Sequence, residues 1–259
     1  MDIKIKDILE EIERHAPLSL QEGYDNSGVQ AGDVNREATA ALLCLDVTEA
    51  VIDEALVRGC NLIISHHPLV FKPIKSLSGK TYIERCLIKA CKHDITVYCA
   101  HTNLDNAPRG VNYHLGMMLG LENMSALGEH SDLTAQGIVG ELPSSEEAMS
   151  FLKRIKEILH APCIRHSAYS GDIRKVALCG GSGAFLIPQA IASKADVFIT
   201  GEARYNDFYD VEDKILLAVA GHYESEICTK GVFHSIISKK FPTFVLHLSD
   251  ADSNPVKYL

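Results

Sequence analysis

Apolar positions along the chain form short runs and helically spaced stripes. Residues 40–45, 61–65 and 95–100 are nearly continuous apolar runs of strand length, and residues 49–58 have the spacing of a helix that ends at Gly59. A further amphipathic helix is predicted near the start of the chain from one apolar stripe: Ile5, Ile8, Leu9 and Ile12. Strands that alternate with helices predict an α/β fold with βαβ units.

The same pattern recurs in the second half of the chain. At an offset of 135, residues 41–44 fall on residues 176–179, and residues 61–65 fall on residues 196–200 without a gap. Any two βαβ units share such a periodicity, so this match alone fits chance as well as it fits duplication.

A second match involves polar residues and favours duplication. At an offset of 121, His101 falls on His222 and Asp105 falls on Glu226. Both histidine–carboxylate pairs follow an apolar run, and both precede a Gly-Val that opens a helix-like segment. Shared periodicity does not explain this order, so we predict two similar α/β lobes that are related by internal duplication.

The divide between the lobes is expected in residues 121–136, which are rich in turn formers and have weak periodicity, as in a linker. We therefore assign residues 1–125 to an N-terminal α/β lobe and residues 126–259 to a C-terminal α/β lobe, with no inserted domain.

Composition narrows the class of protein. Hydrophobic residues make up 46% and charged residues 23%, which is typical of a globular chain rather than a disordered one. A net charge of −9 argues against a broad nucleic-acid surface, and no apolar run reaches the ~20 residues of a membrane helix. The first residues lack a signal-peptide core, and eight cysteines without a C-x-x-C pair favour reduced, buried thiols. We expect a cytoplasmic protein with neither a membrane nor a nucleic-acid partner.

Imidazole and carboxylate groups follow three of the apolar runs. They are His66 and His67, then His101 and Asp105, then His222 and Glu226. Ligands collect at the carboxyl ends of strands in open α/β sheets, so we predict a metal site. The alternative for the adjacent histidines is a solvated loop. Imidazole with carboxylate and without thiolate suits Zn, Mn, Fe, Co or Ni, and a carboxylate can bridge two cations, for which Glu226 has the longer reach.

Three other features have weaker implications. Residues 180–183, Gly-Gly-Ser-Gly, favour a tight turn over a phosphate cradle, because they lack the lysine and the spacing of the known phosphate loops. Residues 24–28 have turn chemistry and favour a plain loop over a site wall. Glu202 takes the place of the second adjacent histidine in the C-terminal lobe, either as an outer group of the site or as a solvated side chain.

Several motifs together resemble a known family. They are Ser-His-His-Pro at 65–68, Ala-His-Thr-Asn-Leu-Asp at 100–105 and Gly-His-Tyr-Glu-Ser-Glu at 221–226, with supporting matches at 24–29, 179–183 and 200–202. In this combination and order the chain resembles the Nif-three-like family, whose members are called dinuclear metal centre proteins or GTP cyclohydrolase I type 2 homologues. One departure is Tyr24, where relatives often carry Trp, which affects a pocket wall rather than the metal site.

The resemblance implies two α/β lobes with a pair of divalent metal ions between them, and ring-shaped homohexamers. It implies that His66 and Asp105 bind one metal, that His67 and His222 bind the other, and that Glu226 binds both. It places His101 close by as a ligand or a proton carrier, and we assign it the catalytic role.

Two functions from different classes follow from these observations. The first is a metal-dependent hydrolase that acts on a small-molecule nucleotide or phosphoester, either as a cyclohydrolase or as a phosphoesterase. The second is a metal-loaded regulatory or protein-binding module without turnover. Nothing in the sequence selects guanine, so the substrate stays open.

Overall fold

The computed structural model describes residues 3–128, 136–251 and 254–259 of the chain. The chain forms two compact units, one comprising residues 1–104 and 229–257 and the other comprising residues 105–228 and 258–259. Each unit has an α/β fold built on its own sheet, which confirms the predicted fold class. Among the described residues, no helix has the length and apolar character needed to cross a membrane.

The first unit is built on a five-stranded sheet in the order β1-β4-β3-β2-β11. The three central strands are parallel and fully buried, as their apolar runs predict: β2 (Ala41–Cys44), β3 (Leu62–Ser65) and β4 (Thr96–Cys99). The edges are β1 (Gly28–Ala31), antiparallel to β4, and β11 (Leu246–Leu248), parallel to β2.

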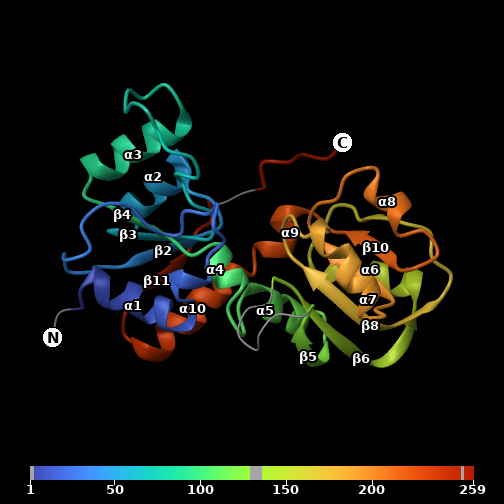
Figure 1. Ribbon diagram of the computed structural model, residues 1–259. Coiled ribbons are helices and arrows are strands. Elements are labelled where there is room, and N and C mark those ends of the chain that lie inside the picture. The colour runs from blue at the N-terminus through green and yellow to red at the C-terminus, as the bar shows by residue number, and fades with distance from the viewer. Residues whose placement is uncertain (1–2, 129–135, 252–253) are drawn as a thin grey trace. The chain divides into compact units, whose positions relative to one another are not determined.

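Helices cover both faces of this sheet (Figure 1). On one face α2 (Glu49–Val57) and α3 (Tyr82–Lys92) pack their apolar sides on the sheet, with Val51 and Ile52 in one cluster with Leu42 and Ile63. The other face is covered by α1 (Ile5–His15), which has the predicted stripe buried, and by α10 (Thr229–Lys240). The short elements η1 (Leu18–Leu20) and α4 (Thr102–Asp105) complete the unit up to residue 104.

The second unit is built on a six-stranded sheet in the order β5-β6-β8-β9-β10-β7. Its parallel centre is β8 (Asp172–Cys179), β9 (Val197–Thr200) and β10 (Leu216–Val219). The remaining strands run antiparallel to their neighbours: β5 (Glu122–Ala126), β6 (Ile138–Glu147) and β7 (Arg165–His166). Strand β5 lies inside the segment predicted as a linker, and residues 129–135 of that segment lie outside the described residues.

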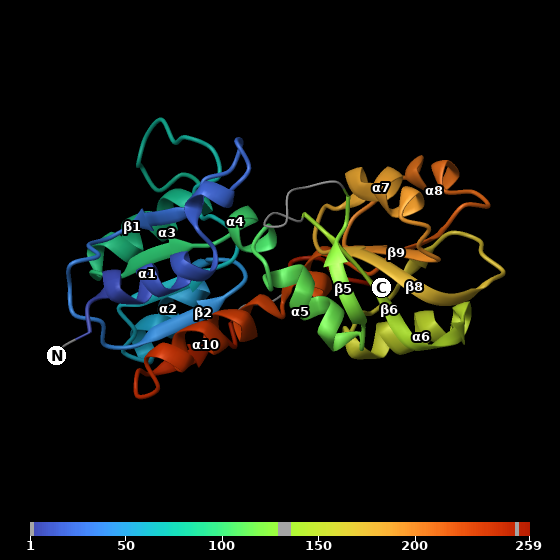
Figure 2. The ribbon, with the colours of Figure 1, turned by 60° about the horizontal axis from the view of Figure 1, so that its bottom comes forward.

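Helices also cover both faces of the second sheet (Figure 2). One face holds α5 (Val111–Met118) and α6 (Ala148–Ile158), whose Leu115 and Phe151 join the core cluster of that face. The other face holds η2 (Ala184–Leu186), α7 (Ile187–Ala192) and α8 (Asp207–Asp210). Helix α9 (His222–Glu226) follows β10 directly.

The strand registers agree with the internal repeat. Ala41 pairs with Leu62 in the first sheet, and Val176 pairs with Val197 in the second, so both partners are shifted by 135 residues. The third strand is shifted by 120 residues, because Leu62 pairs with Thr96 and Val197 pairs with Leu216. The second unit has one extra residue after its third strand, Gly221 with φ +106°. This insertion explains why His222 lies 121 residues after His101 although the strands before them are 120 residues apart.

The two units exchange one helix each. Helix α5 follows β4 of the first unit but packs on β5, β6 and β8 of the second. Its counterpart in the repeat, α10, follows β10 of the second unit but packs on β2 and α1 of the first. The boundaries between the two compact units therefore lie after residues 104 and 228, whereas the turn-rich segment predicts a boundary near residue 125. Apolar periodicity predicts that a helix is buried, but not which sheet buries it.

Candidate metal centre

Three histidines gather at the carboxyl ends of β3 and β4 in the first unit. A ligating nitrogen of each of His66, His67 and His101 lies within 4.8 Å of one from each of the other two. The imidazole centroids of His66 and His67 are 5.1 Å apart, and those of His67 and His101 are 5.5 Å apart. His66 is completely buried. This grouping arises because β3 and β4 are parallel neighbours that end at the same edge of the sheet.

Each of these three rings is held through Nδ1. His66 Nδ1 lies 2.9 Å from the carbonyl oxygen of Ala100, His67 Nδ1 lies 2.8 Å from Asp46 Oδ1, and His101 Nδ1 lies 2.8 Å from Asp25 Oδ1. Because carbonyl and carboxylate oxygens only accept hydrogen bonds, Nδ1 is the donor in each case. Nε2 is then the acceptor nitrogen of each neutral ring.

The second unit holds a histidine–carboxylate pair of the same kind on α9. His222 and Glu226 are four residues apart, so one helical turn places them on the same face, with Nε2 of His222 2.9 Å from Oε2 of Glu226. His222 Nδ1 donates to Oε1 of Glu202 at 2.8 Å, and the hydroxyl of Ser182 donates to the other carboxylate oxygen at 2.7 Å. The hydrogen bond from Ser182 is the main cause that holds the pKa of Glu202 below its usual value. Burial opposes this shift, and the hydrogen bond from His222 adds to it.

The four histidines therefore fit a metal centre. A histidine that binds a metal commonly donates its other ring N–H to a carboxylate or a carbonyl, which fixes the tautomer and directs the ligating nitrogen. All four rings have this arrangement through Nδ1, three of them to carboxylates that lie 20 to 76 residues away in the sequence. Solvated loop histidines have no need of such partners.

Asp105 ends α4 and belongs to the second unit. The negative charges of Asp105 and Glu226 both interact electrostatically with the thiols of Cys179 and Cys228. Burial first, and these two carboxylates second, raise the pKa of Cys228 to about 12 and that of Cys179 well above its usual value. Both thiols are therefore protonated at neutral pH, as expected beside a site of nitrogen and oxygen ligands.

The predicted ligands are thus divided between the two units. His66 and His67 lie in the first unit with His101, whereas Asp105, His222 and Glu226 lie in the second.

Each of the eight cysteines is a free thiol, and most of them are buried, as predicted.

The glycine-rich segment at residues 180–183 forms a tight turn around α9. The backbone N–H groups of Gly180, Gly181 and Gly183 donate to the side chains of Asn112, Ser225 and Thr200, and these bonds occupy the groups that a phosphate cradle would use. A Cβ on Gly181 would lie 3.0 Å from Cδ of Glu226 and would collide with its carboxylate. The turn therefore lets the backbone pass close behind a predicted metal ligand.

Sequence reasoning underestimated Asp25, which it favoured as part of a plain loop. The Asp25 side chain is fully buried and also accepts hydrogen bonds from the Thr102 hydroxyl and backbone N–H. Burial opposes its ionisation, but the bonds from His101 and Thr102 outweigh burial and hold its pKa well below the usual range. Asp25 is therefore an ionised partner that orients His101.

Sequence reasoning missed Asp46 and left Glu202 open. Asp46 lies two residues beyond β2, so the rule that selected His66 beyond β3 could have found it. Glu202 is an outer group of the site, because its carboxylate accepts a hydrogen bond from His222 and holds that ring in orientation, although 57% of its side chain is exposed.

These features define a class: a two-lobed α/β protein with histidine and carboxylate groups at the strand ends, arranged for metal binding. The sequence model of the family Duf34/NIF3 (NGG1p interacting factor 3) matches residues 3–255, so the chain belongs to this family.

Relatives in sequence and in structure agree with this assignment. A protein of Clostridium perfringens called GTP cyclohydrolase 1 type 2 homolog is 35% identical over 229 residues, 86% of this chain and 87% of that protein. One of the same name from Clostridium acetobutylicum is 32% identical over 231 residues, 87% and 86% of the two chains. A hypothetical protein of Staphylococcus aureus has a similar crystal structure, with a TM-score of 0.93, 28% identity and full coverage of both chains. Reduced HcgD from Methanocaldococcus jannaschii has a TM-score of 0.81 and 28% identity, covering 96% of this chain and 99% of that one.

Proposed function

We propose that this protein is a metal-dependent hydrolase with a dinuclear centre that acts on a nucleotide or a phosphoester. The observation that carries the proposal is the common orientation of His66, His67, His101 and His222, each of which is held through Nδ1 by a carbonyl or a carboxylate. This orientation makes Nε2 of all four rings available for a divalent cation.

The ligand assignment follows the family pattern. His66 and Asp105 would hold one cation, His67 and His222 the other, and Glu226 both. The ligands suit Zn, Mn, Fe, Co or Ni. When bound, two such cations would polarise a substrate oxygen and lower the pKa of a bound water to about 7.

His101 is assigned the movement of the proton. Its ring donates Nδ1–H to the ionised Asp25, so Nε2 is a base, and the carboxylate stabilises the imidazolium that forms when Nε2 accepts a proton. A ring nitrogen of His101 lies within 4.8 Å of ligating atoms of His66 and His67, so this side chain can reach a group bound there.

The name of the Clostridium relatives, GTP cyclohydrolase 1 type 2 homolog, supports a nucleotide as the substrate. We further propose a homohexamer, on the family pattern, and a cytoplasmic location, which the free thiols support.

The proposal is tested by metal analysis and turnover on the same preparations. The full chain is loaded with Mn²⁺ or Zn²⁺ and screened against nucleotides and phosphoesters, together with Glu226→Ala. We expect about two metal ions per chain in the wild type, fewer in Glu226→Ala, and a loss of turnover of at least ~100-fold. Glu157→Ala, which changes an exposed glutamate on α6 of the same unit, is the matched control and should behave as the wild type.

Two results would contradict the proposal separately. Unchanged metal content in Glu226→Ala would remove the bridging role. Metal-loaded protein without turnover on any substrate would favour a regulatory or protein-binding module over an enzyme.

A further inference from the structure

The second unit contains a two-part cavity that borders Glu202 and that the metal ligands do not line. One part has a volume of about 550 Å³ and is lined mainly by η2, α7 and α8, and the other has a volume of about 460 Å³ and is bordered by Glu202. Ala184, Phe185 and Asp207 line both parts, so the two are contiguous. Both volumes lie within the roughly 300–1,000 Å³ of small-molecule sites.

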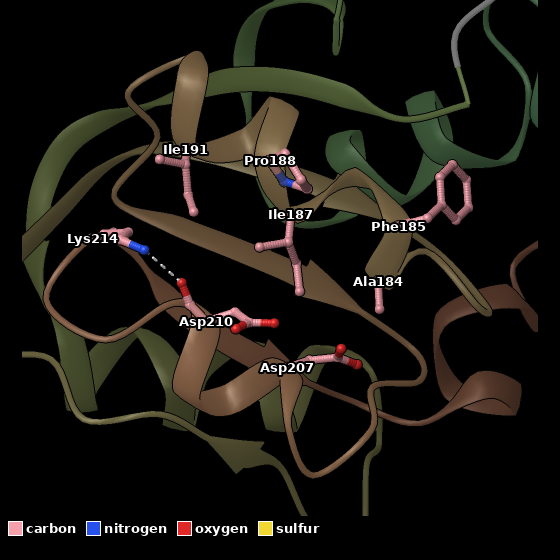
Figure 3. Close-up of a pocket in the computed structure, with 8 residues that line it drawn as sticks. All are labelled: Ala184, Phe185, Ile187, Pro188, Ile191, Asp207, Asp210 and Lys214. Carbon is pink, nitrogen blue, oxygen red and sulfur yellow. Dashed lines mark hydrogen bonds between the residues drawn. The ribbon is translucent and has the colours of Figure 1, made fainter.

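The larger part is apolar on one side and polar on the other. Ile187, Pro188 and Ile191 of α7 face Asp207, Asp210 and Lys214 across it, and Lys214 Nζ donates to the Asp210 carbonyl at 3.0 Å (Figure 3). The apolar side offers van der Waals contact to a ring or a short chain. The Asp207 and Asp210 carboxylates can accept a hydrogen bond from a neutral N–H or O–H.

The smaller part contains two guanidinium groups, from Arg165 and Arg204, and two carboxylates, from Glu202 and Asp207. Both carboxylates already accept hydrogen bonds within the protein, Glu202 from Ser182 and His222, and Asp207 from the backbone N–H of Arg204. Arg165 is fixed in place, because its Nη2 donates to the carbonyl of Ala203 at 3.2 Å and its Cζ lies 5.7 Å from the Phe208 ring centroid. Within the described ranges of the chain, no carboxylate lies within ion-pairing distance of Arg165. Arg204 is 3.7 Å from Asp207 but 90% exposed, so this ion pair is weak.

The side-chain contacts set a direction along the cavity. An anionic group is favoured beside Arg165, whose guanidinium is held by Ala203 and Phe208 and has no ion-paired carboxylate within the described ranges, with Arg204 as a second cation. An apolar group is favoured at the other end, against α7. Glu202 separates the first of these positions from His222, because its carboxylate is bonded to both Ser182 and His222.

We propose that this cavity binds a small organic anion, with its phosphate or carboxylate between Arg165 and Arg204 and its ring or short chain against α7. The inference rests on the proposed function in taking this anion as the part of the substrate that lies away from the reacting bond. Binding there would contribute affinity without contact with the metal ligands.

The test is titration calorimetry on the full chain in EDTA, so that binding is measured without metal and without turnover. Phenyl phosphate and benzoate combine a ring with the two candidate anions, and inorganic phosphate has the charge alone. We expect one aryl anion to bind at least ~10-fold more tightly than inorganic phosphate, and the tighter of the two identifies the anionic group. Arg165→Met should weaken that binding roughly ten-fold or more. Arg174→Met, an exposed arginine on β8 of the same unit that does not line the cavity, should leave it unchanged.

A second variant tests the apolar end. Ile191→Asn should reduce the advantage of the aryl anion over inorganic phosphate while leaving the binding of inorganic phosphate unchanged. Wild-type affinity in Arg165→Met, or equal affinity for aryl and inorganic phosphate in the wild type, would overturn the inference. Metal content and turnover are measured on the same variants. Aryl anion binding in a wild type that takes up no metal would refute only the proposed function, whereas metal-dependent turnover without this binding would refute only the cavity.

Discussion

At the scale of single residues, the candidate metal centre depends on contacts behind the ligands as much as on the ligands. Asp46, Asp25 and Glu202 each hold a different histidine ring through Nδ1. Gly181 contributes by having no side chain, because it passes close to the carboxylate of Glu226 with φ +57°. These residues bind no metal in our proposal, yet each one fixes the direction or position of a group that would.

Gly181→Ala should therefore damage the centre more than it damages the fold. A left-handed backbone costs an alanine about 1–2 kcal/mol of stability, and the new methyl group would also displace the Glu226 carboxylate. We expect lower metal content and a modestly lower melting temperature.

The matched control is Gly59→Ala. Gly59 also has positive φ, at +69°, but a Cβ there meets nothing within 4 Å. It should lose similar stability and retain its metal. Equal metal content in both variants would show that the close approach of Gly181 to Glu226 has no role.

At the scale of elements, local sequence signals determine where the helices begin. Helix α3 starts at a side-chain N-cap, in which Thr81 Oγ1 accepts from the backbone N–H of Glu84. The Glu84 carboxylate in turn accepts hydrogen bonds from the backbone N–H groups of Ser78 and Lys80 and from the Ser78 hydroxyl. The bonds from Ser78 are the main cause that lowers the pKa of Glu84 to about 2.

This shift predicts a pH-dependent contribution to stability. Because the pKa of Glu84 is lower in the folded chain than its usual 4.5, the contribution is complete above about pH 4.5 and is lost as the pH falls towards 2. Glu84→Gln should have a lower melting temperature than the wild type at pH 7, and the gap should close between pH 4.5 and 2. The measurement is thermal unfolding in EDTA at several pH values, with Glu157→Gln as an exposed control on α6. A gap that stays constant down to pH 2 would contradict the assignment.

At the scale of the whole molecule, the exchange of α5 and α10 decides which fragments can fold. Residues 105–228 contain nearly all of the second unit in one continuous stretch, whereas the first unit needs residues 229–257 in addition to 1–104. Leu115 and Leu119 alone, fully buried on the side of α5, contribute about 3–6 kcal/mol to the second unit. This is a large share of the roughly 5–15 kcal/mol by which a typical domain is stable.

We therefore expect residues 105–228 to fold as an isolated fragment and residues 126–259 to fail. The second fragment lacks α5 and β5 and carries α10 without the sheet that buries Val232 and Phe233. Cooperative thermal unfolding and dispersed amide resonances distinguish the two outcomes. Cooperative folding of 126–259, with an unfolded 105–228, would support a boundary near residue 125 instead.

The sequence by itself determined the secondary structure around the candidate site and the chemical types of its residues. Continuous apolar runs identified β2, β3 and β4, and the rule that ligands follow the carboxyl ends of parallel strands identified His66, His67, His101 and His222. These features are local, or repeat with the period of a strand or a helix, so they can be read without knowledge of the fold.

Only the tertiary structure decided which residues support those histidines and which sheet each helix covers. Asp25 and His101 are 76 residues apart, and nothing in either segment specifies the other as its hydrogen-bond partner. In the same way, the sequence predicted helix-like segments after Gly110-Val111 and Gly231-Val232, which became α5 and α10, but either sheet offers an apolar face for a helix to cover. Periodicity records that a side chain leaves water, whereas the choice among chemically equivalent partners is made by packing of the complete chain.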